Sequence, residues 1–252
     1  MRDILLLATF ILQAFLWDMK LRLWRIFHRR GSNEKINRWI ATIPGKILSL
    51  TRFFLDFDVI FQVAPGIKIP PHCLVISNHQ SILDIPLMVY CFPENNVRFA
   101  AKQSLFHFVP LVSQVLRMQR HAKIDRKGRF SRTMKDLERL AREAAAGLSP
   151  VIFPEGTRSR TGKVGPFHSG AVRKIETLTP LPILSVALNG GYKSSKLREV
   201  LGTLRGKRYL IRVLNLYPPP AGKAEVEALL SHVQEEIKQQ VYIWQEQEKK
   251  KI

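Results

Sequence analysis

The chain has 252 residues, 46% of them hydrophobic, which leaves room for one α/β domain with a small appendage and excludes a string of separate domains. Its net charge of +20 indicates polyanionic partners, such as nucleic acid, an anionic bilayer or an acidic carrier protein. The two cysteines, Cys73 and Cys91, stand in apolar stretches. We therefore expect buried thiols in a reducing compartment and no disulfide between them.

Residues 4–17 form an apolar run of about 14 residues, shorter than the ~20 that a helix needs to cross a bilayer unaided. Asp3 and the lack of a small-residue cleavage site argue against a signal peptide. Up to residue 27 the chain turns amphipathic, with basic residues directly behind the apolar block, as in a flank that faces anionic lipid. We interpret residues 4–27 as a helix that dips into or partly crosses a membrane. A buried core helix is the alternative.

A second basic and apolar helix is predicted over residues 35–55, where Pro44 and Gly45 should kink or divide it. Two such helices in succession predict a hairpin that lies on lipid. Basic residues interleaved with large apolar ones also favour a membrane surface over nucleic acid as the anionic partner. Residues 1–55 are therefore predicted to be a membrane-associating segment, and residues 56–252 the main domain.

The main domain alternates predicted strands and helices, which is typical of an α/β fold. Strands are expected at residues 57–64, 73–76, 97–100, 150–153, 181–188 and 209–217. Helices are expected at residues 85–90, at 131–146 with Ser131 as cap and Gly147 after its end, at 171–176, and from Lys223 onward. The last helix aligns one apolar stripe, Val226, Leu229, Leu230, Val233, Ile237 and Val241, which predicts core packing.

The strand at 73–76 is followed by Ser77-Asn78-His79-Gln80-Ser81-Ile82-Leu83-Asp84. A histidine and an aspartate five positions apart would diverge by about 140° on one helix, so His79 should lie before the helix or at its first residue, and Asp84 should lie in its first turn. There the carboxylate can accept the Nδ1 proton and leave Nε2 free to take a proton from a substrate hydroxyl. The structural alternative is a helix-start histidine and an acid favoured by the helix dipole.

A second polar stretch, Phe153-Pro154-Glu155-Gly156-Thr157-Arg158, directly follows the strand at 150–153. If the two strands are parallel, their carboxyl ends meet at one sheet edge, and the two stretches converge on one site. In this order, each at a strand end, they resemble the N-H-x-x-x-x-D and F-P-E-G-T-R motifs of the glycerol-phosphate acyltransferase family.

This resemblance implies an α/β fold with a mostly parallel mixed sheet flanked by helices, an N-terminal two-helix membrane-associating segment and an acyltransferase catalytic domain at residues 56–252. It implies transfer of an acyl group from acyl-CoA or acyl carrier protein to the sn-2 hydroxyl of 1-acyl-glycerol-3-phosphate (lysophosphatidate), giving phosphatidate for phospholipid biosynthesis. The expected partners are lysophosphatidate, the acyl donor and anionic membrane lipids, with no nucleic acid, no cofactor and no metal. The expected location is the cytoplasmic face of the cell inner membrane.

On this resemblance His79 is the catalytic base and Asp84 the carboxylate that orients it. The phosphate of the acceptor would be bound by Arg158, with Arg126 and Lys102 beside it, because a planar guanidinium matches phosphate oxygens bidentately. The five residues come from four separate stretches of the chain. Their convergence is therefore an expectation about the fold as much as about the site.

The other substrate-binding residues expected from the second motif are Glu155, Gly156 and Thr157. Gly156 would let backbone amides approach the bound group closely. Glu155 is expected to hydrogen-bond the glycerol hydroxyl or to hold Arg158. A buried acid paired with Arg158 is the structural alternative.

The chain departs from the family at Ser113 and Arg120, where glycines are usual, and at Ser185, where a proline is usual. These departures leave open the acylation of another lysolipid, such as a lyso-aminolipid without phosphate, although Arg158 favours phosphate. A metal-dependent hydrolase lacks a third and fourth ligand at metal-site spacing. A non-enzymatic basic protein that binds membrane or nucleic acid would explain the charge but not the two motifs.

Overall fold

The computed structural model describes residues 2–28, 34–125, 130–194 and 203–250. Its helices are α1 (Arg2–Phe27), α2 (Glu34–Leu55), α3 (Asp84–Cys91), α4 (Val112–Met118), α5 (Phe130–Ala145), α6 (Gly170–Leu178) and α8 (Gly222–Lys249). Its strands are β1 (Asp58–Val63), β2 (Leu74–Ser77), β3 (Val97–Lys102), β4 (Ala122–Ile124), β5 (Ser149–Ile152), β6 (Ile183–Asn189) and β7 (Arg208–Tyr217). Short 3-10 turns occupy Pro93–Asn95, Gln103–Phe106 and Tyr192–Ser194. Each predicted strand is present within a few residues of its expected bounds.

The described strands form one seven-stranded sheet in the order β1-β7-β6-β2-β5-β3-β4. Among them β6 and β7 pair antiparallel, and every other neighbouring pair is parallel. The predicted α/β class with a mostly parallel mixed sheet is therefore confirmed. The chain moves outward from β2 to β3 and β4 and then returns, so that β5 lies directly between β2 and β3.

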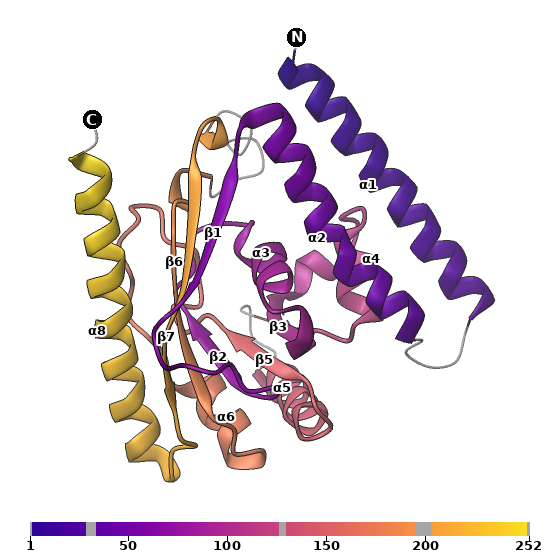
Figure 1. The fold of residues 1–252 in the computed structure, drawn as a ribbon. Coiled ribbons are helices and arrows are strands. Elements are labelled where there is room, and N and C mark those ends of the chain that lie inside the picture. The colour runs from indigo at the N-terminus through magenta and orange to yellow at the C-terminus, as the bar shows by residue number, and fades with distance from the viewer. Residues whose placement is uncertain (1, 29–33, 126–129, 195–202, 251–252) are drawn as a thin grey trace.

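Helices cover both faces of the sheet (Figure 1). One face packs on α5, α6 and α8, and the other on α2 and α3, with α1 lying outside α2 (Figure 1). Successive residues at β2 point to opposite faces of the sheet. Leu74 and Ile76 belong to the cluster under α8, while Val75 and Cys73, the residue just before the strand, belong to the cluster under α3. Both cysteines are free and buried, as expected. Burial raises the pKa of the Cys73 thiol to about 11 and that of Cys91 to about 12.

The C-terminal helix α8 packs through the predicted apolar stripe. Val226, Leu230, Val233, Ile237 and Val241 are all buried in the cluster beneath it. Leu229 is partly buried at the edge of the same cluster. The interpretation of this stripe as core packing is therefore confirmed.

Three local expectations need correction. Helix α2 runs unbroken from Glu34 to Leu55, so Pro44 does not divide it; buried Ile40 and Leu48 on either side of the proline hold both halves in place. Helix α5 begins at Phe130 in the described part of the chain, so Ser131 lies inside its first turn and is not its cap. The seven-residue helix α4 was not anticipated, because it is too short to show a periodic apolar pattern.

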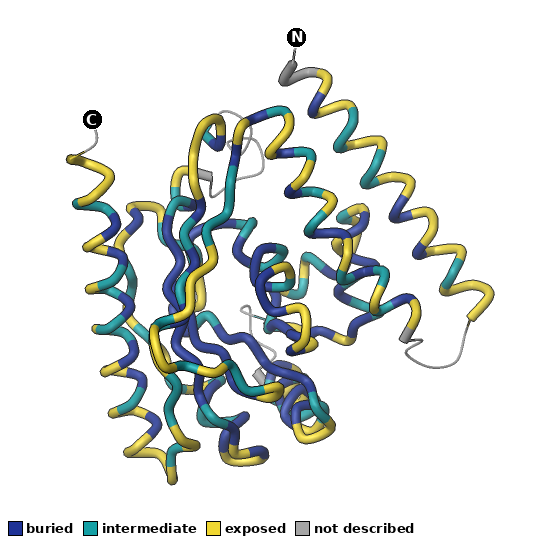
Figure 2. The backbone as a smooth tube through the Cα atoms, in the orientation of Figure 1, coloured by how far each residue is buried: buried dark blue, intermediate teal, exposed yellow. Residues whose placement is uncertain are grey.

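Helix α1 carries a row of large apolar residues that are exposed. Figure 2 shows exposed positions along the length of this helix. The exposed members are Leu5, Leu7, Ile11, Leu12, Phe15, Leu16, Met19, Leu23, Ile26 and Phe27. The opposite side of the helix, with Trp17 and Leu21, is buried against α2 and the residue before α4. Among the described residues, no helix combines the length and the apolarity that crossing a membrane requires.

Candidate active site

The parallel pairing of β2 with β5 brings the two polar stretches together. Val75 lies opposite Val151 and Ile76 opposite Ile152, so the carboxyl ends of both strands reach the same edge of the sheet. Two backbone contacts then join the stretches at His79: its N–H donates to Oε1 of Glu155 at 2.8 Å, and its carbonyl accepts from the N–H of Ser159 at 2.7 Å. The residues of the second motif therefore surround the histidine of the first.

His79 and Asp84 form a hydrogen-bonded pair. His79 precedes α3 and Asp84 is the first residue of that helix, which places Nδ1 of His79 2.6 Å from Oδ2 of Asp84. The imidazole stacks on the ring of Phe153, with centroids 4.3 Å apart, and its side chain is 16% exposed. Within the part of the chain that the structure describes, Nε2 has no hydrogen-bond partner. With the Nδ1 proton held by the carboxylate, Nε2 is the lone-pair nitrogen available to an incoming group.

Asp84 is completely buried and is surrounded by hydrogen-bond donors. Its oxygens accept from the N–H of Gln80 at 2.7 Å, from the N–H of Ser81 at 3.1 Å and from the hydroxyl of Tyr209. Burial, and then the negative charge of Asp84, raises the pKa of Tyr209 well above its ordinary value, so the phenol stays protonated and donates. These donors stabilise the carboxylate as an anion and fix its orientation toward His79.

Asn78 anchors the loop at the end of β2. Its side-chain amide donates to the carbonyl of Leu188 at 2.9 Å and accepts from the N–H of the same residue at 2.8 Å. The side chain thus prolongs the pairing with β6 beyond the last residue of β2, and His79 follows it directly. Asn78 and Tyr209 were not singled out from the sequence. The asparagine inside the first motif was the available signal for one, and no local pattern pointed to the other.

Glu155 is buried, and its carboxylate accepts hydrogen bonds from backbone N–H groups of the site. Oε1 accepts from His79, as described, and Oε2 accepts from the N–H of Gly165 at 2.9 Å. Burial raises the pKa of Glu155, and the two backbone N–H donors oppose that rise because they favour the carboxylate. A Cβ at position 165 would come within 2.9 Å of Oε2, so glycine is what allows this approach. Glu155 therefore links its own segment to the loop that carries His79 and to the segment that carries Gly165.

Gly156, Thr157 and Arg158 continue outward from Glu155. Gly156 has φ +66° and closes a turn by donating to the carbonyl of Phe153 at 3.0 Å, with open space where a Cβ would stand. Thr157 is exposed and Arg158 is half-buried. Since the N–H of Ser159 donates to the carbonyl of His79, Arg158 is next in the chain to a residue that contacts the loop of His79.

The remaining predicted cations lie further along the same edge. Lys102 is the last residue of β3 and is exposed. Because β3 is parallel to β5, Lys102 is at the carboxyl edge that also holds His79 and Glu155, one strand beyond β5. Arg126 falls outside the described residues. The structure therefore brings seven of the eight predicted residues to one edge.

The three departures from the family occupy structural positions. Arg120 has φ +56°, a left-handed conformation natural to glycine, and its guanidinium pairs with Glu143 at 3.0 Å. Ser185 stands at a register shift between β6 and β7, and its hydroxyl donates to Glu236 at 2.7 Å. Ser113 is buried in α4, where its hydroxyl bonds to the backbone of the preceding loop. All three side chains have protein partners.

Helix α8 supports the loop of the second motif from outside. The side chain of Gln234 donates to the carbonyl of Gly165 at 2.7 Å, and that of Gln245 donates to the carbonyl of Gly162 at 3.1 Å. Gln80, next to His79, donates to the same carbonyl of Gly162 at 3.4 Å. The loop between β5 and α6 is thus held between the loop that carries His79 and the C-terminal helix.

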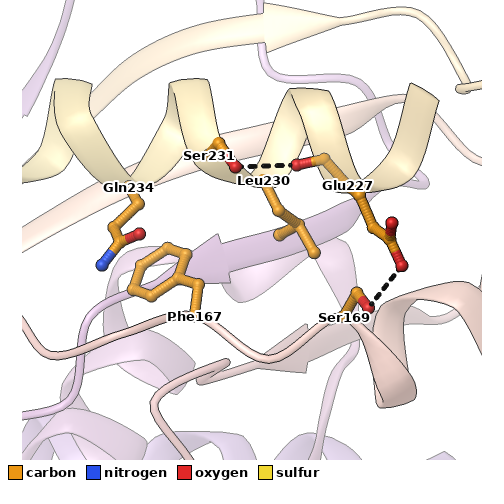
Figure 3. A pocket seen from close by; sticks show the side chains of 6 residues that line it. All are labelled: Phe167, Ser169, Glu227, Leu230, Ser231 and Gln234. Carbon is orange, nitrogen blue, oxygen red and sulfur yellow. Dashed lines mark hydrogen bonds between the residues drawn. The ribbon is translucent and has the colours of Figure 1, made fainter. Parts of the chain in front are cut away.

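A hollow of about 120 Å³ lies between α8 and the loop before α6 (Figure 3). Phe167, Leu230 and Gln234 contribute to its wall, and none of the predicted site residues lines it. The hollow therefore does not indicate the candidate active site, which we identify instead from the convergence of the two motifs. In the described residues, no group of three or more His, Cys, Asp or Glu side chains is arranged to hold a metal ion.

Comparison with known proteins identifies proteins that are similar to this chain. The family model described as "Acyltransferase" matches residues 66–189, which include both motifs. A 1-acyl-sn-glycerol-3-phosphate acyltransferase of Cocos nucifera is 36% identical over 118 residues, covering 46% of this chain and 37% of the relative. The enzyme of the same name from Limnanthes douglasii is 33% identical over 147 residues, covering 58% and 49%. Human 1-acyl-sn-glycerol-3-phosphate acyltransferase beta is 30% identical over 166 residues, covering 63% and 55%.

Among solved structures, the chain resembles the crystal structure of the 1-acyl-sn-glycerophosphate acyltransferase PlsC from Thermotoga maritima. The TM-score is 0.68 at 24% identity, and the match covers 97% of this chain and 98% of the other. At that identity the likeness establishes a shared fold. The matches to the three relatives above cover between 37% and 55% of their length.

Proposed function

Because residues 66–189 match the family model described as "Acyltransferase", we propose that the chain acylates the sn-2 hydroxyl of 1-acyl-glycerol-3-phosphate and so forms phosphatidate. The acyl group comes from a thioester of coenzyme A or of acyl carrier protein. The observation that carries the proposal is the His79–Asp84 hydrogen bond beside the loop that holds Arg158.

In the proposed reaction His79 is the general base. Nε2 takes the proton of the sn-2 hydroxyl while the hydroxyl oxygen attacks the thioester carbonyl. Asp84 holds the ring through Nδ1 and stabilises the imidazolium that forms. When the tetrahedral intermediate collapses, the C–S bond breaks, and the imidazolium returns its proton to the departing thiolate. The base therefore ends each cycle in its starting state.

The acceptor is positioned through its phosphate. Arg158 is the leading phosphate ligand in this proposal, with Lys102 and Arg126 as further candidate cations. A guanidinium binds two phosphate oxygens at once, which fixes the orientation of the glycerol unit as well as its affinity. Gly156 and Thr157 form the adjoining wall of the acceptor site. Glu155 acts as a positioning residue, because its oxygens hold the backbone N–H groups of His79 and Gly165.

The reaction takes place at a membrane in this proposal. Residues 1–55 form the membrane-associating segment and residues 56–252 the catalytic domain, working at the cytoplasmic face of the cell inner membrane. The exposed apolar row of α1 supports a contact with lipid. The net charge of +20 supports an anionic lipid surface, and it also suits both acyl donors, which are anionic.

The test is an acyl-transfer assay that combines a panel of acceptors with both donors. Lysophosphatidate, a lyso-aminolipid, a monoacylglycerol and glycerol 3-phosphate are each offered with acyl-CoA and with acyl carrier protein. The proposal expects phosphatidate from lysophosphatidate to be the fastest product with at least one donor. Faster acylation of a lysolipid without a phosphate monoester would assign the enzyme to another acceptor, and no transfer to any acceptor would contradict the proposal.

A further inference from the structure

The loop that follows β3 presents an aromatic side chain to the outside. This loop, residues 107–111, lies between the turn at Gln103–Phe106 and helix α4. Phe108 is 98% exposed, the highest value among the exposed large apolar residues of the described chain. It also has φ +58°, and Leu111 in the same loop has φ +62°, conformations that bulky residues adopt only under constraint.

Hydrogen bonds hold the backbone of this loop in place. The hydroxyl of Ser113 accepts from the N–H of Val109 at 2.9 Å and donates to the carbonyl of Leu105 at 3.1 Å. The N–H of Leu111 donates to Oδ1 of Asp18 at 2.8 Å, and Asp18 is a buried residue of α1. These contacts hold the backbone on both sides of Phe108. The outward position of the ring is therefore imposed by the fold.

A single exposed apolar residue needs no explanation, but the loop that carries this one is bonded to a helix with many exposed apolar residues. The bond from Leu111 to Asp18 joins the loop to α1, and Figure 2 shows exposed positions along that helix. Val112, the first residue of α4, is exposed as well. The same helix carries three exposed basic residues, Lys20, Arg22 and Arg25. Apolar side chains with interspersed cations match a bilayer that contains anionic lipid.

We propose that Phe108 inserts into an anionic lipid surface together with the outer row of α1, as a lipid contact made by the catalytic domain itself. The loop follows the carboxyl end of β3, the sheet edge at which His79 also lies. Insertion there turns the catalytic edge toward the lipid, so that a lysolipid hydroxyl reaches the base without its acyl chain leaving the bilayer. This inference rests on the membrane location in the proposed function.

A fluorescent label at position 108 tests the insertion directly. Phe108→Cys places a reactive thiol there, while Cys73 and Cys91 are buried with raised pKa values and stay unlabelled. The label is an environment-sensitive dye, and the probe is a vesicle of phosphatidylglycerol and phosphatidylcholine. We expect its emission to shift to shorter wavelength and brighten on vesicle addition. The matched control, Tyr242→Cys on exposed α8, should show no shift.

A second variant measures how much the side chain contributes. Phe108→Asp replaces the ring by a residue that tolerates positive φ, so the fold is expected to remain intact. Its partition onto the same vesicles should fall by about tenfold, because one buried aromatic contact is lost and a negative charge meets anionic lipid. Tyr242→Asp, which adds the same charge on α8, should change partition by less than about twofold.

The outcomes separate this inference from the proposed function. Acyl transfer to lysophosphatidate dispersed in detergent should be equal in Phe108→Asp and the unchanged protein, since no bilayer is present. A label at 108 that stays water-exposed on protein that sediments with vesicles would overturn the insertion, and so would failure of the unchanged protein to bind vesicles. Insertion at 108 by a protein without acyltransferase activity would overturn the proposed function and leave the lipid contact standing.

Discussion

Tyr209 donates a hydrogen bond to Asp84, joining the start of β7 to the first residue of α3. Both side chains are fully buried, and they are 125 positions apart in the chain. The bond reaches Oδ1, while His79 is bound to Oδ2, so the phenol acts on the imidazole through the carboxylate. Tyr209 is therefore a positioning residue of the proposed base.

The first prediction concerns this phenol. Tyr209→Phe removes one donor and leaves the N–H groups of Gln80 and Ser81 on Asp84. A net hydrogen bond is worth about 1 kcal/mol, which corresponds to a roughly fivefold to tenfold fall in kcat. KM for lysophosphatidate should stay unchanged, since the phenol does not touch the acceptor. A variant with full kcat, or with a changed KM and an unchanged kcat, would contradict this role.

The second prediction concerns the base. His79→Ala should lower kcat by at least about 10²-fold, because general base catalysis contributes that much or more. Vesicle binding and the circular dichroism spectrum should be unchanged. His72→Ala, at an exposed histidine just before β2, is the matched control and should keep full activity. Turnover in His79→Ala close to that of the control would remove His79 from the mechanism.

The third prediction concerns the packing space around the Tyr209 side chain. A Cβ at Gly191 would come within 2.7 Å of Cβ of Ser81 and of the Tyr209 hydroxyl. Gly191→Ala should destabilise the fold by about 1–3 kcal/mol through overpacking, and it should lower kcat because the phenol is displaced. Thermal unfolding and kinetics measure both effects. Gly170→Ala, where a Cβ meets nothing within 4 Å, should lose neither stability nor activity. Equal behaviour of the two variants would contradict the packing argument.

The fourth prediction concerns the dependence of stability on pH. Burial raises the pKa of Glu176 from 4.5 to about 7, and its buried Oε1 has no hydrogen-bond partner among the described residues. The folded state therefore holds the proton more tightly than the unfolded state. Stability from this group is fully present below about pH 4.5 and is lost as the pH rises to about 7.

Glu176→Gln should remove the loss of folding stability that occurs as the pH rises from about 4.5 to about 7. At pH 8 the variant should be more stable by about 1–3 kcal/mol, and at pH 4.5 it should match the unchanged protein. Melting temperatures measured at several pH values test this. Glu235→Gln, at an exposed residue of α8, serves as the control and should leave the profile unchanged. A Glu176→Gln profile that still falls between pH 4.5 and 7 would contradict the assignment.

The sequence predicted those parts of the fold and site that are encoded locally. The apolar strands and the stripe on α8 were confirmed, because periodic burial leaves a pattern in any short window. His79 before the helix and Asp84 at its start followed from spacing alone. By contrast, the strand order and the bond from Tyr209 to Asp84 depend on contacts between distant segments, for which a single sequence carries no signal.

Glu155 shows the same limit within a motif. The sequence marked it as a site residue, and its burial was foreseen as one alternative. Its partners, the backbone N–H groups of His79 and Gly165, could not be read from the sequence, because they depend on how the loop after β5 folds back toward β2. The continuity of α2 through Pro44 is a further case, since packing on both sides of the proline outweighs its local preference.

The proposed function depends most directly on Arg158, which we propose binds the phosphate of the acceptor beside His79. The most direct measurement is the ratio of kcat/KM for lysophosphatidate to that for monoacylglycerol, compared between the unchanged protein, Arg158→Ala and Arg160→Ala. We predict a high ratio in the unchanged protein and in the exposed control Arg160→Ala, and a fall of at least about tenfold in Arg158→Ala. A ratio that is the same in all three proteins would contradict the claim.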